Sequence, residues 1–267
     1  MRQILNFKKN YFNYFLFIYV ICGIFFSLNV GITHDESHEL LVWNLNKLKI
    51  FNNLFSTNYD VSFLESGGKY YGFGFHILSF PVELIVKFFL NNFNISENTQ
   101  ILLSKHPSVF IFFLISGIFF KKIIFLITKN KNYSFLCAIL YLTYPYLLGH
   151  SFFNLKDIPF LSVWLICTYY IVRLLENFQK EKKIKIKYIV LLSILTPYLL
   201  SIRISGILIF LEYLIFLIFF INIFHYKTKE VFKSFYKHTF LFFFIFLILF
   251  YILHPNYWKN PLLVIDS

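Results

Sequence analysis

Long apolar segments alternate with short, lysine-rich segments along most of this chain. An α-helix rises about 1.5 Å per residue, so about 20 residues cross a hydrocarbon layer about 30 Å thick. Seven apolar runs reach or approach this length, at residues 11–31, 107–127, 133–149, 158–175, 188–202, 204–224 and 239–253. The pattern therefore predicts an all-α polytopic membrane protein with about seven transmembrane helices.

An eighth apolar run, residues 73–91, differs from these because polar residues interrupt it. It contains Pro81, Glu83 and Lys87. One charge at the centre of a span costs about 2.5–3.5 kcal/mol on insertion scales. We therefore expect a helix that lies in the membrane interface and does not cross the bilayer.

The composition supports a membrane class. The chain is 58% hydrophobic and 14% charged, with a mean hydropathy of +0.65, which excludes a soluble domain of 267 residues. The net charge of +12 comes from basic residues in short segments between apolar runs, so we expect no nucleic acid partner. No internal repeat is evident, and we expect one membrane domain over residues 1–267.

The basic residues also predict the orientation. If residues 73–91 do not cross, most of the 25 Lys and Arg residues lie on the side of the N-terminus, at residues 2–9, 121–131, 173–187 and 227–237. Cytoplasmic loops are enriched in Lys and Arg. We therefore expect a multi-pass protein of the cytoplasmic membrane with a cytoplasmic N-terminus, an outer C-terminus and a long first outer loop over residues 32–106.

A polar segment follows directly after the first apolar run. Residues 33–39 read Thr-His-Asp-Glu-Ser-His-Glu and place three carboxylates at the membrane boundary. Acidic residues at this position are costly, so they indicate function. The alternative interpretation is a solvated helix cap, with Thr33 or Asp35 capping a helix that starts near Glu36.

Three further polar clusters fall on the predicted outer side. The first lies at residues 67–74 and holds Lys69 and Tyr70 among several glycines. The second lies at residues 149–160 between the third and fourth spans, and the third at residues 201–206 includes Arg203. The alternatives are a simple glycine turn at 67–68, an acidic helix start at Asp157 and an Arg203 side chain that extends to the interface.

Together these groups suggest a type of substrate. A carboxylate at the membrane surface acts as a general base toward a hydroxyl group. Lys, Arg and glycine backbone N–H groups hold a phosphate. This combination fits a lipid phosphate that carries a transferable group.

Taken in order, the clusters resemble the GT-C class of membrane glycosyltransferases, and most closely its family 39 group, which includes protein O-mannosyltransferases and lipid A aminoarabinose transferases. Asp35-Glu36 matches the acidic motif after the first span, and Lys69 matches a lipid-phosphate-binding lysine in the same loop. Asp157 matches a second acidic motif at the start of the fourth span. The stretch Gly149-His150-Ser151-Phe152-Phe153-Asn154-Leu155-Lys156-Asp157 looks like the bacterial form of that motif.

The resemblance implies transfer of a sugar, with inversion, from a polyprenyl-phosphate donor to a protein, lipid A or another glycan on the outer face of a bacterial membrane. Asp35 is the implied general base, Glu36 orients it or holds substrate, and Asp157 shapes the site or binds a divalent metal. Implied substrate or phosphate contacts are Lys69, Tyr70, His150, Asn154, Lys156 and Arg203. Members of this class are usually longer, so the resemblance also implies a truncated core module, either active or an inactive fragment.

Two other classes remain open. A lipid or solute transporter usually places polar residues near the bilayer midplane and often shows inverted repeats. A membrane zinc metalloprotease is suggested by His34 and His38, which stand four residues apart as in a zinc-binding helix, although Asp35 stands where Glu is expected.

Overall fold

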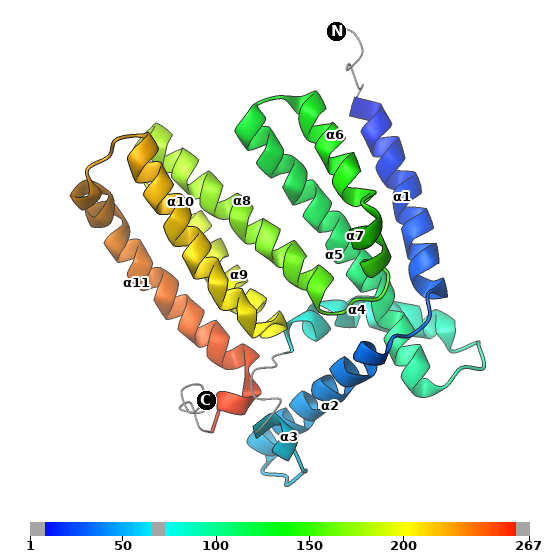
Figure 1. Ribbon diagram of the computed structural model, residues 1–267. Helices are drawn as coiled ribbons and strands as arrows, with labels where there is room; N and C mark the ends of the chain where they lie inside the picture. Colours follow the sequence, from blue (N-terminus) through cyan, green and yellow to red (C-terminus); the bar gives the residue numbers. More distant parts are fainter. Residues whose placement is uncertain (1–8, 66–72, 260–267) are drawn as a thin grey trace. The chain divides into compact units, whose positions relative to one another are not determined.

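The computed structural model describes residues 9–65 and 73–259, and within these ranges every regular element is a helix. Figure 1 shows their course. The elements are α1 (Lys9–Asn29), α2 (His34–Phe55), α3 (Ser62–Glu65), α4 (Gly74–Leu90), α5 (Glu97–Thr128), α6 (Lys131–Leu142), α7 (Pro145–His150), α8 (Asp157–Glu181), α9 (Ile186–Ile202), η1 (Ile204–Leu208), α10 (Ile209–Ile223), α11 (Thr228–Leu253) and η2 (Pro255–Tyr257).

Within residues 9–65 and 73–259, four stretches of helix are long and apolar enough to cross a membrane: Glu97–Thr128, Asp157–Glu181, Ile204–Ile223 and Lys233–Leu253. A fifth is the pair Asn13–Asn29 and His34–Phe55, which bends by 87° at a short break. Large side chains such as Phe240, at 75% exposure, and Phe88, at 72%, cover the outside of these and neighbouring helices. Exposed apolar surface on this scale is what a lipid solvent favours. The chain is therefore an all-α, membrane-embedded protein.

The run at residues 133–149 does not form one continuous helix. It divides into α6, with 12 residues, and α7, with six, at Thr143 and Tyr144. Pro145 explains the break, because its ring disfavours a helical conformation at the residue before it while fitting the first turn of a new helix. The run at residues 188–202 forms α9, which has only 17 residues.

The chain divides into two compact units, Met1–Leu40 with Phe75–Ser162, and Leu41–Gly74 with Val163–Ser267. The expectation of a single domain stays a prediction. In the first unit α5 packs against both α1 and α6. A Cβ atom at Gly23 would lie 1.8 Å from the ring of Phe110, and one at Gly117 would lie 2.5 Å from Leu142. These glycines allow close approach of α5 to α1 and to α6.

A hydroxyl group closes the end of α6 in the same unit. The hydroxyl of Tyr19 in α1 donates to the carbonyl oxygen of Leu142, at 2.5 Å. Leu142 is the last residue of α6, where helix carbonyls lack partners within the helix. The contact ties α1 to the point where α6 ends.

The carboxylate of α4 is paired with two lysines. Glu83 contacts Lys105 of α5, and its other oxygen lies 3.0 Å from the amino group of Lys87, one turn later in α4. Glu83 and Lys105 are buried, at 4% and 0% exposure. A buried charge is tolerated when it is paired. This pairing explains how residues 73–91 form a helix despite the charges within an apolar run.

In the second unit, α9 packs along α11, and α10 carries a carboxylate toward α8. Glu212 of α10 accepts hydrogen bonds from the indole N–H of Trp164 and, at 2.6 Å, from the hydroxyl of Thr168. The carboxylate of Glu212 is thus paired with two side chains of the neighbouring α8.

Candidate functional site

The first turn of α2 is fixed by the side chain of Glu36, which accepts two hydrogen bonds from Thr33. Thr33 precedes the helix, and Oε1 of Glu36 accepts hydrogen bonds from the backbone N–H of Thr33 at 2.7 Å and from its hydroxyl at 2.9 Å. A Thr followed three residues later by Glu is the pattern of a capping box. Thr33 does precede the helix, as the cap alternative expected, but the accepting oxygen belongs to the buried Glu36 and not to Thr33 or Asp35, and the helix begins at His34.

The same glutamate is held by a histidine from α5. Nε2 of His106 lies 2.6 Å from Oε2 of Glu36, and Nδ1 lies 2.9 Å from the carbonyl oxygen of Ser27 in α1. His106 is fully buried and Glu36 is 2% exposed. A carbonyl oxygen only accepts hydrogen bonds, so Nδ1 is the donor in the contact with Ser27. His106 thereby joins the end of α1 to the start of α2.

A second contact joins the next turn of α2 to the segment before α8. The amino group of Lys156 lies 3.0 Å from Oε1 of Glu39. Glu36 and Glu39 are three residues apart, so both project from neighbouring positions on α2. Lys156, a predicted phosphate ligand, is therefore in contact with a carboxylate.

Asn154 shapes the turn that leads into α8. Its side-chain oxygen accepts from the backbone N–H groups of Lys156 at 3.1 Å and Asp157 at 2.7 Å. Its amide nitrogen contacts Nδ1 of His150 at 3.2 Å and donates to Asp157 at 3.3 Å. Three predicted site residues of the 149–160 cluster, His150, Asn154 and Asp157, are thus brought together, and Asn154 orders the other two.

Two carboxylates at this cluster face the surface. Asp35 and Asp157 are both exposed, whereas Glu36 is buried. Asp35 precedes Glu39 by one helical turn, which places the two on one face of α2. Glu39 contacts Lys156, the neighbour of Asp157. The contact of Glu39 with Lys156 therefore links the turn of α2 that carries Asp35 to the segment before Asp157.

The other predicted site residues have different outcomes. Lys69 and Tyr70 lie outside the described residues. Arg203 is exposed in the second unit, where it follows the last residue of α9 with an extended backbone, and its predicted role stays a prediction. His34 and His38 are exposed on α2. Within residues 9–65 and 73–259, no group of three or more His, Cys, Asp or Glu side chains could hold a metal ion.

The structure adds two residues that the sequence did not single out as site residues. His106 lies in a helix far along the chain, and only its position beside Lys105 and Pro107 marked it as a polar break in an apolar segment. Glu39 belonged to the acidic cluster, but its spacing alone did not identify Lys156 as its partner.

No family model, curated protein or solved structure matches this chain.

Proposed function

We propose that this chain is a membrane glycosyltransferase of the GT-C type, which moves a sugar from a polyprenyl-phosphate donor to an acceptor on the outer face of a bacterial cytoplasmic membrane. The observation that carries the proposal is an exposed carboxylate, Asp35, on a helix turn that is anchored by the buried contact between Glu36 and His106. A general base must be accessible to substrate and held in position. This turn meets both requirements.

In this proposal Asp35 removes the proton of an acceptor hydroxyl group. The hydroxyl oxygen then forms a bond to the anomeric carbon of the sugar, and the bond from that carbon to the phosphate oxygen breaks. Polyprenyl phosphate leaves with the bonding electrons, and attack from the opposite face inverts the configuration. Glu36 positions Asp35, because it fixes the turn on which Asp35 stands.

Lys156 supplies positive charge for the departing phosphate. Its ammonium group has three N–H donors, so it binds a phosphate oxygen while it keeps its contact with Glu39. Electrostatic stabilisation of a leaving group is strong in a site of restricted water access. Asp157 stands beside Lys156 and shapes the acceptor side of the site.

The topology belongs to the same proposal. Seven crossings with a cytoplasmic N-terminus put the starts of α2 and α8 on the outer face, with α4 in the interface. In this topology α6 and α7 together form one crossing, and the short α9 forms another. Nucleotide-activated sugars are absent from that side, so a lipid-linked donor suits the site.

A transporter is the second candidate, and one observation favours it. Glu212 lies within the membrane-spanning stretch Ile204–Ile223 and is bound by Trp164 and Thr168. Ionisable groups inside a membrane often mark substrate or ion pathways. Movement of a labelled substrate across proteoliposomes without a covalent product, and its loss in Glu212→Gln, would favour this candidate.

The test of the proposal compares carboxylate variants in a transfer assay with purified protein in lipid and a labelled polyprenyl-phosphate sugar. Asp35→Asn removes the base without changing the size of the side chain, and we expect transfer to fall by at least about 100-fold. Glu97→Gln is the matched control, because Glu97 is another exposed acid in the first turn of a helix. Equal transfer by both variants would remove Asp35 from the mechanism.

A further inference from the structure

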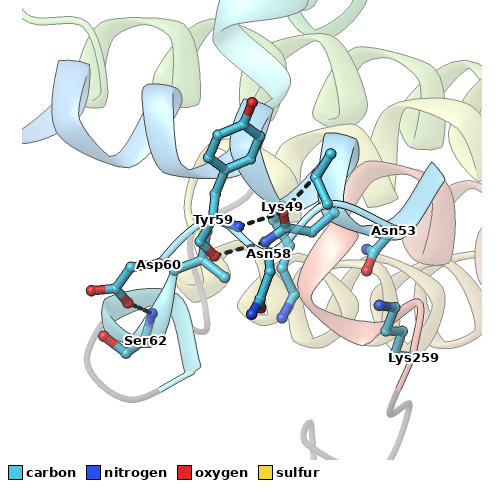
Figure 2. Close-up of a pocket in the computed structure, with 10 residues that line it drawn as sticks. Lys49, Asn53, Asn58, Tyr59, Asp60, Ser62 and Lys259 are labelled. Carbon is cyan, nitrogen blue, oxygen red and sulfur yellow. Dashed lines mark hydrogen bonds between the residues drawn. The ribbon is translucent and has the colours of Figure 1, made fainter. Parts of the chain in front are cut away.

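A polar pocket of about 450 Å³ lies at the end of α2, and none of its lining residues belongs to the proposed transfer site (Figure 2). All of its lining residues belong to the second unit. They come from the last turns of α2, from the segment 57–61, from the start of α3 and from Lys259 after η2. The lining carries lysine amines, asparagine amides, hydroxyl groups and a carboxylate, which together form a hydrogen-bonding surface.

One asparagine holds the loop that forms the wall of this pocket. The side-chain oxygen of Asn52 accepts from the hydroxyl of Thr57 and from the backbone N–H of Tyr59, both at 2.9 Å. Its amide nitrogen donates to the carbonyl oxygen of Tyr59 at 2.8 Å. Asn52 is buried and these three hydrogen bonds are partly buried, so a side chain anchored in the fold holds the exposed loop. The pocket is therefore a built feature of the fold.

A second asparagine places the pocket at the level of the lipid headgroups. The amide nitrogen of Asn53 donates to the carbonyl oxygen of Pro255 at 3.0 Å. Pro255 stands two residues after Leu253, where the membrane-spanning stretch Lys233–Leu253 ends. The pocket wall is thus tied to the end of a membrane-spanning helix, which is where polar headgroups lie.

The side-chain oxygen of Asn53 indicates a ligand. This oxygen is buried and has no hydrogen-bond partner among the described residues. A buried acceptor without a hydrogen-bond partner is unfavourable because it has lost its contact with water. A ligand hydroxyl that donates to this oxygen removes the cost.

The charged and polar side chains of the pocket lie on different sides of it. Figure 2 shows Asn53 and Lys259 on one side, Asp60 and Ser62 on the opposite side, and Lys49 and Asn58 between them. Lys49 is 7% exposed, so solvent screens an anion at its amino group only weakly. Hydrogen bonds from the backbone and side chain of Ser62 lower the pKa of Asp60, which keeps this exposed carboxylate charged. Two ammonium groups and one carboxylate leave the lining net positive.

We propose that this pocket binds a phosphorylated polyol, with its phosphate at Lys49 and Lys259 and its hydroxyl groups at Asn53 and Asp60. Ammonium groups bind phosphate through charge-assisted hydrogen bonds, and carboxylate and amide oxygens accept from hydroxyl groups. Such a ligand exists as a lipid headgroup and as a free sugar or glycerol phosphate. The shared chemistry is a phosphate next to hydroxyl groups.

The test uses the full chain in lipid nanodiscs and two probes. In the soluble arm, glycerol 3-phosphate is titrated into protein in phosphatidylcholine nanodiscs by calorimetry. In the lipid arm, native mass spectrometry counts phosphatidylglycerol retained from a mixture with phosphatidylcholine. Binding in the soluble arm alone identifies a free metabolite as the source, and retention in the lipid arm alone identifies a headgroup.

The variants decide whether binding occurs in this pocket. We expect Lys259→Gln and Lys49→Gln each to weaken binding by about tenfold, since each removes a charge-assisted contact. Lys259 is exposed, so its variant tests the site even if Lys49→Gln alters folding. Lys47→Gln is the control, because Lys47 lies over the ring of Trp43 on the same helix and does not line the pocket. Binding of neither probe, or equal binding by all variants, would overturn the proposal.

Discussion

At the scale of single residues, burial separates two neighbouring acids that the sequence presents as a pair. Asp35 and Glu36 are adjacent, but Asp35 is exposed and Glu36 is 2% exposed and bound to His106. The sequence offered Thr33 or Asp35 as the capping residue, whereas Glu36 supplies the oxygen that accepts from Thr33. It did not identify His106 as the partner, because that contact joins residues 70 positions apart.

The first residue-scale prediction concerns this buried contact. His106→Ala leaves Glu36 buried without its partner, so we expect the free energy of unfolding to fall by about 3–5 kcal/mol. Denaturant unfolding in detergent measures the change. Asp35→Asn is the control, with an expected change within about 0.5 kcal/mol because Asp35 is exposed. Similar stabilities for the two variants would mean that the contact with His106 does not anchor the turn.

The second residue-scale prediction concerns pH. Burial lowers the pKa of His254 to about 4, against opposing hydrogen bonds to the carbonyl groups of Phe250 and Leu200. The unfolded state, with an ordinary pKa near about 6.5, binds a proton first as the pH falls. Stability should therefore be unaffected above that pH and decrease by up to about 3 kcal/mol as the pH falls toward 4.

Thermal unfolding midpoints in detergent across this pH range measure the effect. His254→Gln should lose that part of the pH dependence, while the exposed His34→Gln should keep it. An unchanged profile in His254→Gln would show that other groups are responsible.

At the scale of elements, the positions of the apolar runs predicted the helices well. The sequence did not predict which helices contact one another. The run 107–127 falls within α5, and residues 73–91 correspond to α4. The run 133–149 looked like one continuous span. Pro145 divides it, because proline fits the first turn of a helix and here starts α7. The contact of Glu83 with Lys105 depends on tertiary packing, which neither residue's local sequence specifies.

The element-scale prediction concerns the approach of α1 to α5. Gly→Ala in a helix normally adds about 1 kcal/mol of stability. At Gly23 the added methyl group overlaps the buried ring of Phe110, so we expect a loss of about 1–3 kcal/mol. Unfolding in detergent measures the sign.

Two further variants show whether the overlap is the cause. Phe110→Leu removes the ring, and in that background Gly23→Ala should cost less. Gly149→Ala is the matched control, because no atom lies within 4 Å of a Cβ placed there. If Gly23→Ala stabilises the protein as Gly149→Ala does, the close approach of α1 and α5 is not tight.

At the scale of the whole molecule, the hydropathy of the chain predicted the class. The apolar composition indicated a membrane protein, and the long apolar helices confirm it. The number of crossings and the orientation stay predictions, because the short α9 and the divided α6–α7 segment admit more than one count. Charge distribution, which predicts orientation, acts during insertion and leaves no mark on helix geometry.

The orientation has its own test. In a cysteine-free background, His38→Cys lies at the predicted outer surface and Lys131→Cys at the predicted cytoplasmic surface, and both positions are exposed. We expect a membrane-impermeant maleimide to label His38→Cys in intact cells and Lys131→Cys only after permeabilisation. The reverse pattern would place the start of α2 in the cytoplasm, away from the proposed substrate.

Release of label from a panel of radiolabelled polyprenyl-phosphate sugars by the purified chain in lipid tests the transfer reaction itself. We expect at least one donor to lose its sugar to an acceptor, with inverted configuration in the product and with release that requires Asp35. Release from no donor under conditions in which the protein remains folded, or release that persists in Asp35→Asn, would contradict the proposed reaction.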